Sequence, residues 1–166
     1  TKKMGSSAKA SLDIAFIHLL SKDAKKPLHE YFGTVDMTPI KTDVTISLND
    51  ADTMLKDAKK AYSNGMNILK VKVGSDVLHA VNVVRAISKE LPDAQILVDA
   101  NQAWSLEQSL FFCQNSKDLK LELIEQPVVA NDLEGLKQIT EVSHIPILAD
   151  EAAFTLKEVQ NIVESK

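Results

Sequence analysis

Apolar and polar positions alternate in blocks along most of the chain, and the blocks recur in the same order. After residue 42, a short run rich in apolar and β-branched residues is followed each time by a stretch with the amphipathic spacing of a helix. The β-like runs are 43–48, 67–73, 95–99, 121–125 and 146–149, and the helical stretches are roughly 51–64, 76–91, 105–116, 132–142 and 155–165. Five strands that alternate with five helices predict βα units and a parallel sheet.

The residues at the ends of these blocks support the assignment. Asp76, Ser105, Asp132 and Thr155 stand where helices would begin, and each can accept a hydrogen bond from the free backbone N–H groups there. Gly65 stands where the first of the five helices would end. The middle strands are almost wholly apolar before their last residue, which is typical of parallel strands that are buried on both faces.

The first 42 residues follow another pattern. Residues 1–10 are polar and are expected to be frayed, but from Ser11 apolar residues recur at helical spacing. A second short helical piece is expected at 27–32, and the next residues have the composition of a connector. The sequence therefore predicts two parts, a helical part with its connector at 1–42 and the βα units at 43–166.

Composition narrows the classes of protein that fit this pattern. The chain has 166 residues, of which 45% are hydrophobic, and a net charge of −4 from 19 Lys+Arg and 23 Asp+Glu. Such a chain can build a core, and without a basic face it is not expected to bind nucleic acid. Neither a signal peptide nor a membrane span of ~18 apolar residues is expected. The single cysteine, Cys113, suits a reducing compartment, so a cytoplasmic protein is expected.

Four ionisable side chains follow successive β-like runs at nearly equal intervals. Lys72, Asp99, Glu125 and Asp150 are separated by 27, 26 and 25 residues, each close to the length of one βα unit. In a parallel sheet all strands end on the same side, so these groups are expected to meet at one rim. That rim is where α/β folds carry their chemistry.

Three of the four groups are carboxylates, and their convergence would be unfavourable unless a cation lay among them. Oxygen ligands without His or Cys suit a hard ion, so Asp99, Glu125 and Asp150 are candidate ligands of one Mg²⁺. The alternative is that these acids are helix caps or solvated loop residues. That alternative is less expected for three acids that are each separated by the length of one βα unit.

The strand at 67–73 adds a pair of lysines. Lys70 and Lys72 are two residues apart and therefore point to the same face. Two neighbouring ammonium groups lower each other's proton affinity, and burial does the same, so a lysine can become a base near neutral pH. With a metal at the same rim, the pair favours removal of a proton next to a carboxylate through an enediolate. The alternative is an exposed lysine pair on an edge strand.

These positions resemble motifs of the enolase superfamily, in its muconate-lactonizing subgroup. The matching stretches are Leu-Lys-Val-Lys-Val-Gly (69–74), Val-Asp-Ala-Asn-Gln-Ala-Trp (98–104), Leu-Ile-Glu-Gln-Pro (123–127) and Ile-Leu-Ala-Asp-Glu (147–151). Thr-Ile-Ser-Leu-Asn (45–49) and Gln-Pro-Val-x-x-x-Asp-Leu-x-Gly-Leu (126–136) are most similar to dipeptide epimerases of the L-Ala-D/L-Glu type. The resemblance implies an α/β fold, a partial (β/α) TIM-type barrel of about five βα units, preceded by the last helices of an α+β capping domain.

The resemblance also implies a role for each matching residue. Lys72 would accept and donate the proton on one face of the substrate. Lys70 would contact the substrate carboxylate. Thr45 would contact another part of the substrate. The ligands of the single Mg²⁺ would be Asp99, Glu125 and Asp150. The residues that support the rim from behind would be Asn101 and Glu151. The implied substrate is a small molecule, either a dipeptide or an N-acyl amino acid. The protein is expected to be a homo-oligomer, and neither nucleic acid nor a membrane is expected as a partner.

The resemblance covers nearly the whole chain, but the chain covers only about half of the family's length. The family's opposing lysine, last strand and specificity loop lie outside it, so the 166-residue chain is expected to be inactive alone. N-succinylamino acid racemase, o-succinylbenzoate synthase and muconate cycloisomerase share the metal and lysine sets and remain alternatives. So does a non-catalytic metal-binding fragment, whereas a phosphoacceptor receiver domain is disfavoured because it needs its lysine after the fifth strand.

Overall fold

The computed structural model describes residues 5–33 and 38–165, and the chain divides into two compact units between residues 41 and 42. The first unit contains helix α1 (Ser6–Asp23) and the single turn α2 (Leu28–Tyr31). Helix α1 begins earlier than the sequence pattern predicts, so the expectation that residues 6–10 are frayed is wrong. Ser, Ala and Lys are adequate to good helix formers, and the Lys9 N–H donates to the Gly5 carbonyl at 3.1 Å. The expected frayed end at 1–4 and part of the connector, 34–37, lie outside the described residues.

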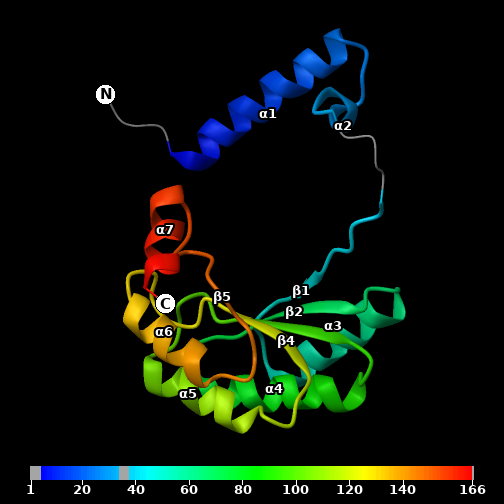
Figure 1. Ribbon diagram of the computed structural model, residues 1–166. Coiled ribbons are helices and arrows are strands. Elements are labelled where there is room, and N and C mark those ends of the chain that lie inside the picture. The colour runs from blue at the N-terminus through cyan, green and yellow to red at the C-terminus, as the bar shows by residue number, and fades with distance from the viewer. Residues whose placement is uncertain (1–4, 34–37, 166) are drawn as a thin grey trace. The chain divides into compact units, whose positions relative to one another are not determined.

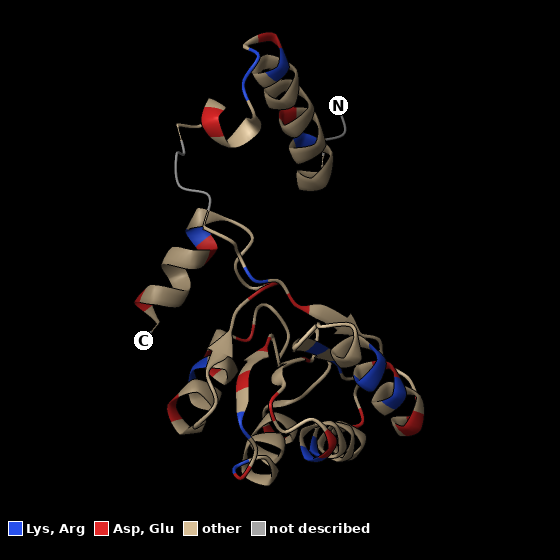
Figure 2. Cartoon of the chain, turned by 90° about the vertical axis from the view of Figure 1, so that its right-hand side faces the viewer, with Lys and Arg blue, Asp and Glu red and all other residues tan. Residues whose placement is uncertain are grey.

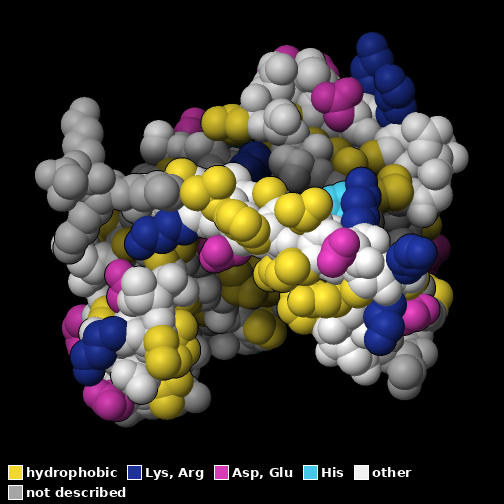
Figure 3. Space-filling model, turned by 90° about the horizontal axis from the view of Figure 1, so that it is seen from above, with side chains coloured by type: hydrophobic (Ala, Val, Ile, Leu, Met, Phe, Trp, Pro, Cys, Tyr) yellow, Lys and Arg dark blue, Asp and Glu magenta, His cyan; other side chains and the backbone are white. Residues whose placement is uncertain are grey.

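Apolar side chains cover much of the surface of α1 (Figure 3). Leu12, Ile14, Phe16 and Leu19 are all more than half exposed, and the only buried residue of the helix is Ser21. The helix predicted from the apolar spacing is therefore present. Its interpretation as the end of a capping domain stays a prediction.

The second unit confirms the five predicted βα units. In chain order the elements are β1 (Val44–Ile46), α3 (Ala51–Ser63), β2 (Ile68–Lys72), α4 (Val77–Glu90), β3 (Gln95–Asp99), α5 (Leu106–Asn115), β4 (Leu121–Glu125), α6 (Leu133–Val142), β5 (Ile147–Leu148) and α7 (Leu156–Glu164). The four predicted N-cap side chains each accept a hydrogen bond from a backbone N–H of the first helical turn. Gly65 follows α3 with φ of 85°, a left-handed conformation that favours glycine.

The five strands form one parallel sheet in the order β1-β2-β3-β4-β5. A sheet in which each strand lies beside the next one in sequence is an arc of a TIM-type barrel. The receiver domain has the doubly wound order 2-1-3-4-5, so that alternative is excluded. Acidic and basic residues are interspersed along the helices that flank the sheet (Figure 2).

Helices α3 to α6 cover one face of the sheet (Figure 1). On that face, Leu69, Val71, Val98 and Ile124 are buried, and they belong to one core with Phe112 of α5. The residues that alternate with them in β2 and β3 are mostly only partly buried. The expectation that the middle strands are buried on both faces is therefore not met in this chain: helices cover one face, and on the other face Asp99 is buried while its neighbours in β2 and β3 are only partly buried. Nowhere in 5–33 and 38–165 is a helix long and apolar enough to cross a bilayer.

We expect the 166-residue chain, prepared by itself, to self-associate. Strands β1 and β5 each pair with a single neighbour, and Leu48 and Leu148 beside these edges are 52% and 40% exposed. Unpaired strand edges and exposed apolar surface favour association. Sedimentation equilibrium should show oligomers, and Leu148→Lys, which places a charge at the β5 edge, should shift them toward monomer. A monodisperse monomer of the unchanged chain would contradict this expectation.

Candidate active site

The register of the sheet gathers the predicted residues at its carboxyl edge. Lys72 pairs with Asp99, and Asp99 pairs with Glu125, so these three residues form one row across β2, β3 and β4. The alignment depends on a register shift between Ile96 and Leu97, which brings the end of β3 level with the end of β4. Glu125 in turn pairs with Leu148. Asp150 follows two residues after Leu148, at the same edge.

The two lysines are held by the carboxylates of this row. Lys72 Nζ donates to Asp99 Oδ2 at 2.7 Å, and Lys70 Nζ lies 3.0 Å from the same oxygen. Lys70 Nζ also donates to Glu125 Oε1 at 2.8 Å. Both lysines therefore point to one face, as predicted, and share one carboxylate oxygen of Asp99.

Asn101 extends this network toward the next loop. Its side-chain oxygen accepts from Lys72 Nζ at 2.5 Å, and its Nδ2 donates to Glu151 Oε1 at 3.2 Å. Asn101 also donates its backbone N–H to Asp99 Oδ1 at 3.0 Å. Asn101 and Glu151 thus lie behind Lys72 and Asp99, in a position to support the rim.

Burial and charge act in opposite directions on the two central carboxylates. The Asp99 side chain has no exposed surface, and burial raises the pKa of its carboxyl, but hydrogen bonds from Lys72 and Lys70 outweigh burial and hold it below its ordinary value. Burial raises the pKa of Glu125, and the negative charges of Asp99 and Asp150 raise it further against the effect of Lys70. Both Asp99 and Asp150 therefore interact electrostatically with Glu125, and the three carboxylates form one group of interacting charges.

The predicted lowering of proton affinity does not hold for Lys70. Burial of its ammonium group lowers the pKa, but the hydrogen bonds and charges of Glu125 and Asp99 overcome this effect, and the pKa of Lys70 lies above its ordinary value. Two carboxylates in direct contact with Lys70 stabilise its charged form, and neither contact can be recognised from the lysine pair and its strand alone.

The three carboxylates do not converge on one point in this arrangement. Among the described residues, no group of three His, Cys, Asp or Glu side chains is arranged to hold a metal ion. The reason is visible in the contacts, because Lys70 bridges Glu125 and Asp99 and the Asp150 residue is exposed. The donor set nevertheless fits a hard cation, since it consists of carboxylate oxygens, the Asp99 side chain is fully buried, and the negative charges of Asp99 and Asp150 raise the pKa of Glu125. The assignment of the three as ligands stays a prediction.

Thr45 lies on the same face of the sheet as the lysines. It is exposed in β1, and its Cα is paired with that of Lys70 in the parallel register. A side chain in this place can reach a molecule bound over Lys70. Its contact with substrate stays a prediction.

Three residues join the loops of the rim, and sequence reasoning assigned no role to two of them, Gln102 and Gln126. Trp104, 3% exposed, donates its ring N–H to the Gly74 carbonyl at 2.9 Å. Gln102 and Gln126 both have left-handed backbone, with φ of 65° and 36°, and their side-chain oxygens accept from N–H groups of neighbouring loops. The signal available in the sequence was that all three lie inside the stretches 98–104 and 123–127, which resemble motifs of the superfamily.

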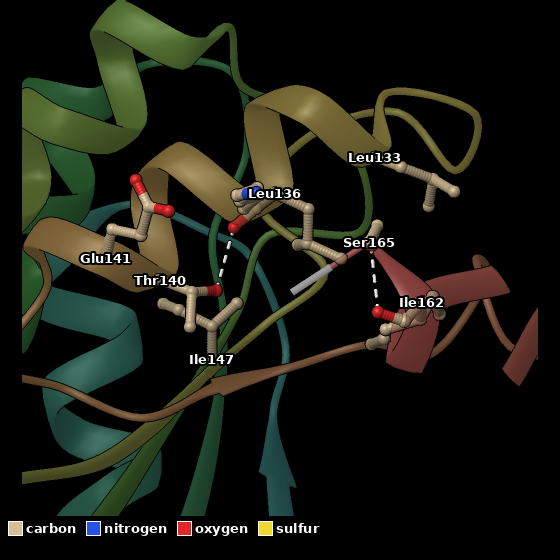
Figure 4. A pocket seen from close by; sticks show the side chains of 9 residues that line it. Leu133, Leu136, Thr140, Glu141, Ile147, Ile162 and Ser165 are labelled. Atoms are coloured by element: carbon tan, nitrogen blue, oxygen red, sulfur yellow. Dashed lines mark hydrogen bonds between the residues drawn. The ribbon is translucent and has the colours of Figure 1, made fainter. Parts of the chain in front are cut away.

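An open groove of about 350 Å³ lies away from this cluster, between α6, β5 and α7 (Figure 4). Leu136, Ile147 and Ile162 line it. The hydroxyls of Thr140 and Ser165 at its wall donate to carbonyls of their own helices, each at 2.8 Å. The groove is mainly apolar, with Lys137 and Glu141 as the charged residues of its lining. The network of lysines and carboxylates lies at the carboxyl edge of the sheet, which is therefore the candidate site for chemistry.

The fold and the site together agree with one family. Residues 53–166 match the model of the enolase C-terminal domain-like family, and the chain belongs to that family. Over 163 residues, 98% of this chain, it is 66% identical to an L-amino acid-D/L-Glu epimerase of Sulfurimonas denitrificans. The chain covers 48% of that relative and spans about half the length of the curated relatives it matches.

Solved structures give the same picture. A dipeptide epimerase from Enterococcus faecalis, crystallised with Mg and the dipeptide L-Leu-L-Tyr, is similar with a TM-score of 0.86 and 33% identity, over 92% of this chain and 43% of that one. A muconate cycloisomerase from Pseudomonas fluorescens is similar with a TM-score of 0.76 and 28% identity, over 84% of this chain and 39% of that one. The predicted superfamily, the partial barrel and the similarity to dipeptide epimerases are confirmed.

Proposed function

We propose that the full-length protein is a Mg²⁺-dependent epimerase of dipeptides of the L-Ala-D/L-Glu type, and that this chain provides its metal ligands and one of its bases. The observation that carries the proposal is the row of Lys72, Asp99 and Glu125 at the carboxyl edge of the sheet, with Lys70 between the two carboxylates. The similarity to epimerases over nearly the whole chain supports the substrate class.

The metal would be held by Asp99, Glu125 and Asp150. Bound there, Mg²⁺ would supply positive charge that stabilises the negative charge developing on the substrate carboxylate. Among the residues of this chain, Lys70 adds a second positive charge for that carboxylate. Thr45, exposed beside Lys70, would contact the rest of the dipeptide.

Lys72 would move the proton. Its Nζ, as the neutral amine, would take the proton from the carbon next to the carboxylate of one epimer. As the ammonium, it would deliver a proton to that same face when the other epimer has lost its proton on the opposite face. Asp99 and Asn101 accept hydrogen bonds from this nitrogen and so fix its position at the edge of the sheet. Glu151 holds the Asn101 amide from the other side and so keeps its oxygen directed at Lys72.

The test is proton exchange by the full-length protein in deuterated water. With Mg²⁺ and L-Ala-L-Glu, we expect deuterium at the α-carbon of the glutamate and formation of L-Ala-D-Glu, followed by NMR and chiral chromatography. Chelation of the metal should stop both, and added Mg²⁺ should restore them.

Parallel assays separate this proposal from its alternatives. The similarity to a muconate cycloisomerase makes muconate lactones the first comparison, with N-succinylamino acids and the precursor of o-succinylbenzoate beside them. If any of these compounds has a higher kcat/KM than every dipeptide tested, the protein should be assigned to the class that acts on that compound. Metal binding without turnover of any of them would instead favour a non-catalytic role.

A further inference from the structure

Gln126 is a fully buried polar residue that the proposed chemistry does not use. It directly follows Glu125, yet neither its amide oxygen nor its amide nitrogen contacts the lysines or carboxylates of the site. Burial of an amide is unfavourable unless its hydrogen bonds are made within the protein. Its backbone has φ of 36°, a conformation that is uncommon for a residue with a side chain. Such a backbone conformation persists only where the surrounding contacts hold it in place.

The side chain of Gln126 holds the loop after β5. Its Oε1 accepts from the backbone N–H of Asp150 at 2.9 Å and from that of Ala152 at 3.1 Å. Its Nε2 donates to the Val128 carbonyl at 3.0 Å, which fixes the orientation of the amide. A side chain that directly follows β4 therefore accepts two hydrogen bonds from a loop 24 to 26 residues further along the chain.

The sheet itself does not reach Asp150. Strand β5 has only two residues, and its last hydrogen bond at this end runs from the Gln126 N–H to the Leu148 carbonyl at 2.8 Å. Beyond Leu148, the Gln126 amide replaces the missing strand partner. It continues the pairing by two residues with a side-chain oxygen in place of a backbone carbonyl.

We infer that Gln126 is the positioning residue for Asp150: its amide holds the Asp150 backbone at the sheet edge that carries Asp99 and Glu125, where a cation would gather the three carboxylates. The inference rests on the proposed function, because it takes Asp150 as a metal ligand. In this proposal Gln126 contacts neither the metal nor the substrate, and it acts through its hydrogen bond to the backbone of Asp150.

The test replaces the amide in the full-length protein and measures binding of Mg²⁺ alone by calorimetry. Gln126→Met keeps a similar length and volume but removes the hydrogen bonds to Asp150, Ala152 and Val128. Loss of a residue that orients a ligand typically weakens metal affinity by about 10- to 100-fold, and we expect a weakening in this range. We also expect faster amide hydrogen exchange at Asp150 and Ala152, and recovery of kcat at high Mg²⁺.

Gln102→Met is the matched control. Gln102 also has left-handed backbone and accepts from a loop N–H, that of Ala130 at 2.9 Å, but it does not touch Asp150. Its replacement should leave Mg²⁺ affinity and exchange at Asp150 as in the unchanged protein. If Gln126→Met does not fold, Gln126→Asn gives the same measurement, because its amide is one methylene too short to reach both N–H groups.

The outcomes separate the two proposals. Mg²⁺ affinity and Asp150 exchange that are unchanged in the Gln126 variants, or equally changed in the Gln102 control, would overturn the positioning role and leave the epimerase proposal intact. Tight Mg²⁺ binding that depends on Gln126, in a protein that exchanges no dipeptide α-proton, would support the positioning role and overturn the epimerase proposal. Absence of Mg²⁺ binding by the unchanged protein would overturn both.

Discussion

Replacing Lys72 with alanine in the full-length protein is expected to abolish α-proton exchange from one epimer of the dipeptide and to stop epimerisation. Lys72 lies at the end of β2 on one face of the sheet, so its Nζ can reach the α-carbon from one side only. A positioned acid–base group contributes about 10²- to 10⁴-fold to such a step, and exchange from the affected epimer should fall by that factor. The measurement is the initial rate of deuterium incorporation into L-Ala-L-Glu and L-Ala-D-Glu separately.

Two further variants separate the base from its charge. Lys72→Arg keeps a cation beside Asp99 but cannot lose its proton near neutral pH, so it should retain thermal stability and still lose exchange. Lys59→Ala is the control, because Lys59 forms an exposed ion pair with Glu90, 2.6 Å apart, that involves none of the site residues. Exchange of both epimers at the unchanged rate by Lys72→Arg would count against Lys72 as the base.

Asp99→Asn is expected to remove Mg²⁺ binding and activity together. Asp99 is the one side chain of the cluster with no exposed surface, and it contacts both Lys70 and Lys72. Loss of a ligand's charge should weaken Mg²⁺ affinity by more than the roughly 10- to 100-fold that loss of an orienting residue causes. The measurements are calorimetry with Mg²⁺ alone and the exchange assay.

The same substitution is expected to lower stability in the absence of metal. Removing one partner from a buried ion pair destabilises a protein by about 3–5 kcal/mol, and partial exposure of both lysines places the expected loss at or below the lower end. Asp118→Asn is the control, since it breaks an exposed ion pair with Arg85 and leaves the site unchanged. Full Mg²⁺ affinity in Asp99→Asn would remove Asp99 from the ligand set.

Local patterns in the sequence were sufficient to predict the helices and strands of the second unit, residues 42–166. The period of apolar residues distinguishes strands from helices, and the N-cap side chains at Asp76, Ser105, Asp132 and Thr155 mark where four helices begin. That Lys70 and Lys72 share a face follows from the two-residue period of any strand. Equal spacing of the ionisable groups then placed them at one edge, because parallel strands end on one side.

Tertiary structure decided what the local pattern does not contain. The register shift between Ile96 and Leu97, which aligns Asp99 with Glu125, depends on how two strands pair and leaves no periodic trace in either one. The raised pKa of Lys70 depends on carboxylates that lie 29 and 55 residues away along the chain (99 − 70 and 125 − 70).

The role of Gln126 was decided in the same way. In the sequence it is one polar residue after a strand, but in the fold its amide completes the pairing of a two-residue strand and holds the loop that carries Asp150. The sequence by itself therefore determined which elements form, which residues share a face and which edge carries the chemistry. Only the packed sheet determined how the charges pair and which buried amide holds the loop of Asp150, because those contacts join residues that are distant in sequence.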